Sequence, residues 1–196
     1  RVGNGASTLI NTGNPVFLDE YTPSGTFVAS YTLPTAPGGT NKALVSAGSS
    51  TSECLLTRST DARFLVMAGY SSTIPAGSSL TASTAASVNR TVGIVSVNGG
   101  IDTSTALNDF ASGSSPRGAA SDNGSNLWVS GGAGSVRYAT AGGSTSTQLA
   151  TTPTNIRAVF IAGGQLFFSA QSLGFRVATL GSGLPTTSGQ TAANLP

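Results

Sequence analysis

Three cations are the residues best placed to do chemistry in this sequence. Arg117 and Arg157 each precede a similar apolar segment, and Lys42 is a candidate for the same role earlier in the chain. A guanidinium group binds a carboxylate through two parallel hydrogen bonds, so cations gathered around one channel would bind an anion or an acidic sugar. The alternative is that each cation pairs with a neighbouring carboxylate or caps backbone carbonyl groups.

Residues suited to catalysis are scarce. The sequence contains no His, which excludes Ser-His-Asp and Cys-His catalysis and His-ligated zinc. The lone Cys54 lies in an apolar run, where it is expected to be a small buried hydrophobe. Asp19 and Glu20 are adjacent, so on a strand they point to opposite faces and do not form an acid–base pair. We therefore expect no enzyme activity, no catalytic residue, no cofactor and no metal site.

Two aromatic residues are candidates for stacking on a sugar ring, namely Trp128 and Tyr138. Trp128 follows Leu127 inside an apolar strand, so packing in the core is the alternative for its side chain. The phenylalanines in the second half of the chain, including Phe160 and Phe167, cluster or alternate within predicted strands. They are expected to lie in the core between sheets.

One pattern occurs twice between residues 116 and 196, and it predicts the architecture. Its period is about 40 residues, and each copy divides into four short strands joined by Gly, Asn and Ser turns. A four-stranded antiparallel unit of this length is typical of a propeller blade. The aligned pairs are Arg117 with Arg157, Leu127 with Leu166, Arg137 with Arg176, and Gly142 with Gly181.

The first half of the chain predicts three hairpins, with turns at residues 23–25, 60–62 and 98–100. A segment rich in small and hydroxyl residues, 71–87, is expected to be an exposed insertion. Residues 1–9 contain a candidate strand of an incomplete first blade. We therefore predict one all-β domain over residues 1–196. We expect an incomplete propeller of about three complete four-stranded blades plus a partial one, and such a set of blades could be a fragment of a longer propeller.

Composition excludes some classes of partner. Charged residues make up 8% of the chain, the net charge is +2, and the cations are scattered singly, so no footprint for nucleic acid is present. No apolar segment approaches the roughly 20 residues that a membrane-spanning helix needs. The composition predicts a folded protein with a hydroxyl-rich surface of low charge.

Several turn and strand motifs resemble a family of secreted bacterial β-propeller proteins of unassigned activity, and the resemblance runs essentially from end to end. It implies an extracellular location and further blades beyond the last residue, and it brings no catalytic residues. The motifs are Pro15-Val-Phe-Leu-Asp-Glu-Tyr-Thr-Pro-Ser-Gly, Thr57-Arg-Ser-Thr-Asp-Ala-Arg-Phe-Leu, Val88-Asn-Arg-Thr-Val-Gly and Gly183-Leu-Pro-Thr-Thr-Ser-Gly-Gln-Thr.

These observations favour an extracellular, non-enzymatic β-propeller that acts as a structural, surface-binding or self-assembling module. Three and a fraction blades do not close a ring of about six or seven. We therefore expect the rest of a longer protein, or another protein chain, to cover the open blade edges. The first alternative is a carbohydrate-binding propeller with a glycan partner. The second is a hydrolase or lyase, which the absence of His and of paired acids disfavours.

Overall fold

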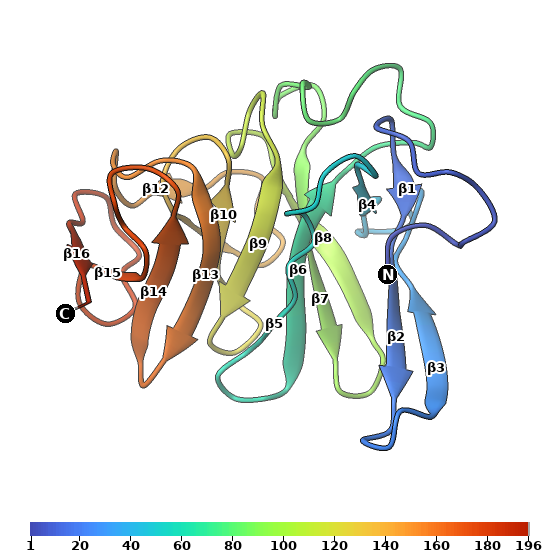
Figure 1. Cartoon of the computed structure of the whole chain (residues 1–196), viewed down its shortest axis with the longest axis horizontal. Coiled ribbons are helices and arrows are strands. Elements are labelled where there is room, and N and C mark those ends of the chain that lie inside the picture. Colours follow the sequence, from blue (N-terminus) through green and yellow to red (C-terminus); the bar gives the residue numbers. More distant parts are fainter. Residues whose placement is uncertain (196) are drawn as a thin grey trace.

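In the computed structural model, which describes residues 1–195, every regular element is a β-strand (Figure 1). The strands are β1 (Asn14–Pro15), β2 (Phe17–Tyr21), β3 (Phe27–Thr32), β4 (Val45–Ser46), β5 (Thr57–Arg58), β6 (Phe64–Tyr70), β7 (Arg90–Ser96), β8 (Ile101–Leu107), β9 (Pro116–Ser121), β10 (Asn126–Gly131), β11 (Arg137–Thr140), β12 (Thr147–Gln148), β13 (Ile156–Ala162), β14 (Gln165–Ala170), β15 (Ala178–Leu180) and β16 (Ala192–Asn194).

The two sequence repeats form two four-stranded antiparallel sheets. One has the order β9-β10-β11-β12 and the other β13-β14-β15-β16, so each sheet follows the chain strand by strand. Leu127 and Leu166 are the second residues of β10 and β14, and both are fully buried. The predicted equivalence of these two leucines is therefore confirmed.

The strands β5 to β8 form a third antiparallel series, which confirms two of the predicted hairpins. β6 pairs with β5 on one side and with β7 on the other, and β8 follows β7. The short strand β4 pairs with the same edge of β6, at Tyr70, and β1 pairs with β4. The sequence did not predict β1 and β4, because a two-residue strand has no alternation of apolar and polar side chains.

The three sheets stand side by side in chain order, and their first strands are neighbours (Figure 1). Leu55, just before β5, forms a parallel bridge with Gly118 of β9. Along β9, Ala119 contributes to the core shared with β5–β8, whereas Ala120 contributes to the core shared with β13–β16. These small side chains allow neighbouring sheets to approach closely on both sides of β9.

The N-terminal part differs from the prediction of a strand within residues 1–9. Only Val2 pairs there, in an isolated bridge with Val16, while β2 and β3 form the predicted hairpin as a separate two-stranded sheet. Gly3 and Gly5 adopt φ values of +76° and +82°, which interrupt an extended conformation. The last strand, β16, pairs with β15 and not with the N-terminal residues, so the described chain forms an open arc and not a closed ring.

The predicted insertion, 71–87, contains no strand, which confirms that it lies outside the sheets. It is not wholly exposed, however, and that part of the prediction is wrong. Leu80 is fully buried against Val45 and Tyr70, and its backbone amide donates to the carbonyl of Asn11 at 3.1 Å. A large apolar side chain in a polar loop anchors the loop to the nearest core.

One face of the last sheet is uncovered. Phe160 is 37% exposed and Phe167 is half-buried, although both were expected in the core. Phe168, the next residue along β14, is fully buried against β9–β12. Because neighbouring residues of a strand point to opposite faces, Phe167 points away from that core, on the side where residues 1–195 supply no further sheet.

Candidate functional site

Arg117 joins two sheets. It is the second residue of β9 and only 8% exposed, and its Nη1 donates to Asn155 Oδ1 at 2.7 Å and to the Ile156 carbonyl at 2.8 Å. Its buried Nε has no hydrogen-bond partner. Burial lowers the pKa of Arg117, and the positive charge of Arg157 lowers it further. These contacts match the expected alternative, in which the cation caps backbone carbonyl groups between sheets.

Of the three predicted cations, the structure brings two together. Arg157 lies in β13, at the register shift between Ile156 and Ala158, directly after the residues that Arg117 contacts. Lys42 does not belong to this set, because its backbone amide donates at 3.1 Å to Thr103 in β8, the last strand of the β5–β8 series. The predicted ring of three cations is therefore wrong. No carboxylate among residues 1–195 forms an ion pair with either arginine.

Of the two aromatic candidates, Trp128 is packed inside the protein and Tyr138 is half-buried against the same core. Trp128 is 1% exposed, and its Nε1 donates to the carbonyl of Pro185 at 2.8 Å. The Tyr138 ring lies 5.6 Å from it, and the Tyr138 hydroxyl donates to Asn126 Oδ1 at 2.7 Å. Trp128 therefore has no free face for a sugar ring, and its role in the core between two sheets is the one that the structure supports.

Two charged residues make many contacts that the sequence did not predict. Arg90 is fully buried and donates to several backbone carbonyl groups, including that of Ala111, while its guanidinium lies 4.8 Å from the Tyr70 ring centroid. Glu53 accepts hydrogen bonds from the Tyr70 hydroxyl at 2.8 Å and from Ser46 Oγ at 3.0 Å. These contacts join segments that are separated in the chain, so no local sequence pattern predicts them.

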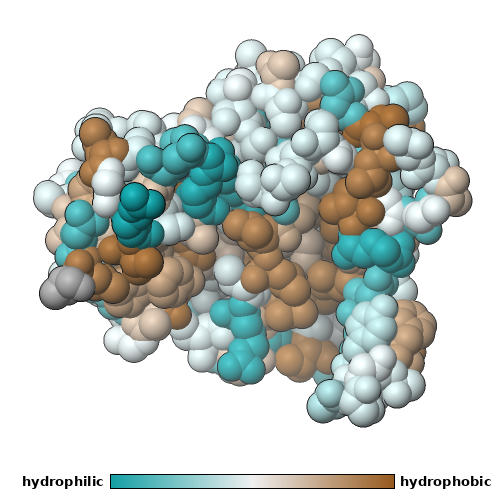
Figure 2. Space-filling view, in the orientation of Figure 1, coloured by the Kyte–Doolittle hydropathy of each residue, from teal (hydrophilic) through white to brown (hydrophobic). Residues whose placement is uncertain are grey.

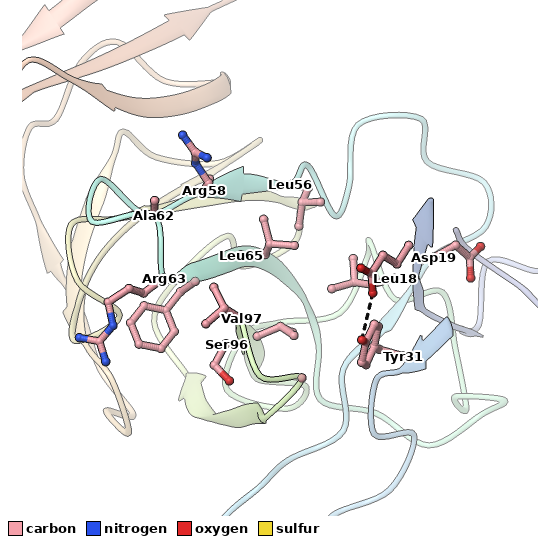
Figure 3. Close-up of a pocket in the computed structure, with 14 residues that line it drawn as sticks. Leu18, Asp19, Tyr31, Leu56, Arg58, Ala62, Arg63, Leu65, Ser96 and Val97 are labelled. Atoms are coloured by element: carbon pink, nitrogen blue, oxygen red, sulfur yellow. Dashed lines mark hydrogen bonds between the residues drawn. The ribbon is translucent and has the colours of Figure 1, made fainter. Parts of the chain in front are cut away.

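A pocket of about 340 Å³ lies between the β2–β3 hairpin and the turns that join β5 to β6 and β7 to β8 (Figure 3). Figure 2 shows hydrophobic surface in the hollow beside this hairpin. The volume lies within the range of ligand-binding pockets. Its apolar lining includes Leu18, Leu56, Phe64, Leu65 and Val95.

Charged side chains of opposite sign stand on opposite walls of the pocket. Glu20 lies on β2, and Arg58 and Arg63 lie on the β5–β6 hairpin. The Tyr31 hydroxyl donates to Glu20 Oε2 at 3.1 Å, and this contact raises the pKa of Tyr31. The pocket thus combines an apolar floor with one acidic and one basic wall.

Asp19 also holds the N-terminal residues against β2. Arg1 Nε donates to Asp19 Oδ2 at 2.8 Å, and Ser30 Oγ donates to Asp19 Oδ1 at 2.6 Å. The hydrogen bonds from Arg1 and Ser30 lower the pKa of the Asp19 carboxyl. Figure 3 shows the Asp19 side chain turned away from the space between Leu18 and Leu65.

Among residues 1–195, no group of three or more His, Cys, Asp or Glu side chains is placed to hold a metal ion. Burial raises the pKa of the Cys54 thiol to about 12, so it stays protonated at neutral pH and is a poor nucleophile. The described residues include no helix that is long and apolar enough to cross a membrane.

Comparisons with protein-family models, with curated proteins and with solved structures gave no match. The resemblance to secreted propeller proteins therefore stays a prediction that depends on the sequence motifs alone.

Proposed function

We propose that this chain is an extracellular, non-enzymatic scaffold module, and that its three four-stranded series are consecutive blades of an incomplete propeller. In this proposal the uncovered face of β13–β16 binds another antiparallel β-sheet. The first strands β5, β9 and β13 lie next to one another, and each series continues outward strand by strand. This arrangement supports the blade assignment, since propeller blades are ordered in the same way.

The observation that carries the proposal is the exposed aromatic pair on the last sheet. The rings of Phe160 and Phe167 stack with centroids 5.2 Å apart and planes at 12°. Val177 and Leu195 lie on the same face and are both exposed, so this face carries four exposed or half-buried apolar side chains. Exposed apolar side chains gathered on one face of a sheet mark an interaction site.

The preceding sheet, β9–β12, indicates what covers the equivalent face. Trp128 stands opposite Ala120 in the β9–β10 pair, as Phe167 stands opposite Phe160 in the β13–β14 pair. Trp128 and Ala120 are buried because β13–β16 covers them. By analogy, a further sheet would cover Phe160 and Phe167, whether it comes from the rest of a longer protein or from another chain.

Composition supports an extracellular scaffold. The low charge gives weak electrostatic repulsion between copies, which favours association. The carbohydrate-binding alternative loses Trp128 as a stacking platform because that ring is buried. A glycan-array screen separates the two functions, and we expect no enrichment of any glycan.

Self-association of the purified chain tests the proposal, because an apolar face without its natural cover tends to pair with itself. We expect the mean mass by light scattering to rise with concentration, and the double substitution Phe160→Ser, Phe167→Ser to abolish the rise. The matched control is Tyr21→Ser, Phe27→Ser, which removes an exposed aromatic pair from the β2–β3 hairpin. A monomer at all concentrations, or equal effects of the two double variants, would overturn the proposal.

A further inference from the structure

The two repeated arginines occupy the same irregular position in their sheets. Arg117 has no partner on β10, because the pairing of β9 passes directly from Gly118 to Pro116. Arg157 likewise has no partner on β14, because the pairing of β13 skips it. Each arginine is therefore the extra residue of a β-bulge. A bulge bends its strand and redirects a side chain, and bulges are frequent beside functional sites.

The two cations lie close together. β9 and β13 are neighbours (Figure 1), and Arg117 Nη1 donates at 2.8 Å to the carbonyl of Ile156, the residue that precedes Arg157. Burial lowers the pKa of Arg117, and repulsion by Arg157 lowers it further, which outweighs the opposite effect of Glu53. Neither arginine forms an ion pair with a carboxylate of residues 1–195. The described part of the chain therefore leaves this pair of charges without a counter-ion.

Arg117 also keeps part of its hydrogen-bonding capacity free. Its Nη1 donates to Asn155 Oδ1 and to the Ile156 carbonyl, whereas its Nε and Nη2 have no acceptor among the described residues. The side chain is only 8% exposed, so water makes up little of this loss. A buried charge with unsatisfied donors is costly, and an oxygen acceptor at Nη2 would remove part of the cost.

Gly132 leaves space beside this free nitrogen. A Cβ atom at position 132 would stand 3.2 Å from Arg117 Nη2 and would overlap the hydroxyl of Ser114. The guanidinium and the hydroxyl therefore border the same space, which a side chain at position 132 would fill. Ser114 is half-buried, and its hydroxyl can rotate to donate to an anion there.

We propose that Arg117 Nη2, the Arg157 guanidinium and the Ser114 hydroxyl bind a tetrahedral dianion, either sulfate or hydrogen phosphate. A doubly charged ligand balances both cations. Its oxygens point in several directions, so they can accept from donors on different segments. Charge-assisted hydrogen bonds of this kind are about twice as strong as neutral ones. The site is separate from the uncovered face of β13–β16 and does not depend on the proposed function.

NMR of the arginine side chains in isotope-labelled protein tests the site. The probe is sodium sulfate, with sodium chloride keeping the ionic strength at about 0.1 M. We expect saturable shifts of the Nε–H signals of Arg117 and Arg157, and no shift at the exposed Arg176. Sodium phosphate, at a pH where it is doubly charged, is the second probe, and the tighter of the two anions identifies the ligand. Sodium acetate, with a single charge, should bind at least about tenfold more weakly.

Two variants with the same chemical change provide the matched comparison. Arg157→Gln removes one cation of the site, whereas Arg176→Gln removes an exposed arginine that has no ion pair among residues 1–195. Sulfate binding should weaken at least about tenfold in the first variant and stay unchanged in the second. Gly132→Ala fills the space beside Nη2 and should weaken binding by a similar factor. Equal affinities of the two arginine variants, shifts that do not saturate, or acetate binding as tight as sulfate binding would overturn the proposal.

Discussion

The sheets β9–β12 and β13–β16 carry the same sequence repeat but differ in how many of their faces are covered. Trp128 in the first sheet and Phe167 in the second occupy the same place in the strand pairing. Trp128 is buried because a sheet follows it, and Phe167 is partly exposed because none follows among the described residues. A repeat therefore predicts which way a side chain points, whereas its burial depends on the neighbouring sheet.

The largest expected effect is the difference between truncating these two aromatic residues. Trp128→Ala should lower the free energy of unfolding by about 3–5 kcal/mol, because it leaves a cavity and an unpaired Pro185 carbonyl. Phe167→Ala should lower it by only about 1 kcal/mol, mainly through lost stacking on Phe160. Urea denaturation followed by circular dichroism measures both. Equal losses would mean that the second face is covered in solution.

Much of this architecture could be predicted from the sequence, because the signals are local. The turn at Asp61 is an example, since its Oδ1 accepts from Ser59 Oγ at 2.6 Å and from the Arg63 amide at 3.1 Å, as expected for an Asp in a turn. The repeat and the hairpins likewise depend on alternation and turn residues within about 40 positions.

The remaining features depend on contacts between distant segments. Lys42 was misplaced because residues 41–46 run along the end of the β5–β8 sheet, from Thr103 toward Tyr70, and do not form an inner strand. The pocket was missed because it forms where the β2–β3 hairpin meets two turns far along the chain. Neither arrangement leaves a periodic trace in the sequence.

The two repeated arginines should differ in a similar way to the two aromatic residues. Arg117→Met removes the donor to the Asn155 side chain and the Ile156 carbonyl, and should lower the free energy of unfolding by about 1–3 kcal/mol. Arg157→Met should change it by less than about 0.5 kcal/mol, because that side chain is only half-buried and makes no comparable hydrogen bond among the described residues. Thermal unfolding under identical conditions measures both, and a larger loss for Arg157→Met would reverse the structural assignment.

The β5–β8 series offers a further comparison at a matching position. Leu55 forms a bridge with Gly118, and the residues that precede these two are Cys54 and Arg117. Burial raises the pKa of this thiol from about 9 to about 12. The unfolded thiol therefore ionises before the folded one, so its contribution to stability is complete below pH 8 and is lost as the pH rises toward 12. At pH 10 the loss should be about 1 kcal/mol.

The matched variant for this measurement is Cys54→Ser, which removes the titrating thiol. The difference in free energy of unfolding between wild type and variant should shrink between pH 8 and pH 10. A difference that stays constant over this range would show that the thiol is accessible to water in the folded protein.

The smallest expected effect concerns the arginines in the third strand region of each repeat. Arg137 Nη2 lies 3.1 Å from Asp109 Oδ2, and Asp109 also accepts from the Ser146 amide at 2.9 Å. Arg176, its counterpart in the sequence repeat, is exposed and has no ion pair among residues 1–195. Arg137→Gln should therefore cost about 0.2–1 kcal/mol, and Arg176→Gln should cost nothing measurable.

The salt dependence of the unfolding free energy distinguishes the contribution of this ion pair from the other contributions of the Arg137 side chain. Its Nε also donates to Ser146 Oγ and its Nη1 to Gln148 Oε1, and these contacts with neutral acceptors respond weakly to salt. The cost of Arg137→Gln should therefore fall as ionic strength rises to about 1 M, where the screening length is about 3 Å. A cost that does not change with salt would assign the effect to the Ser146 and Gln148 contacts. In that case the repeats would differ at this position through the hydrogen bonds of Arg137 to neutral acceptors, and the ion pair with Asp109 would contribute nothing to the difference.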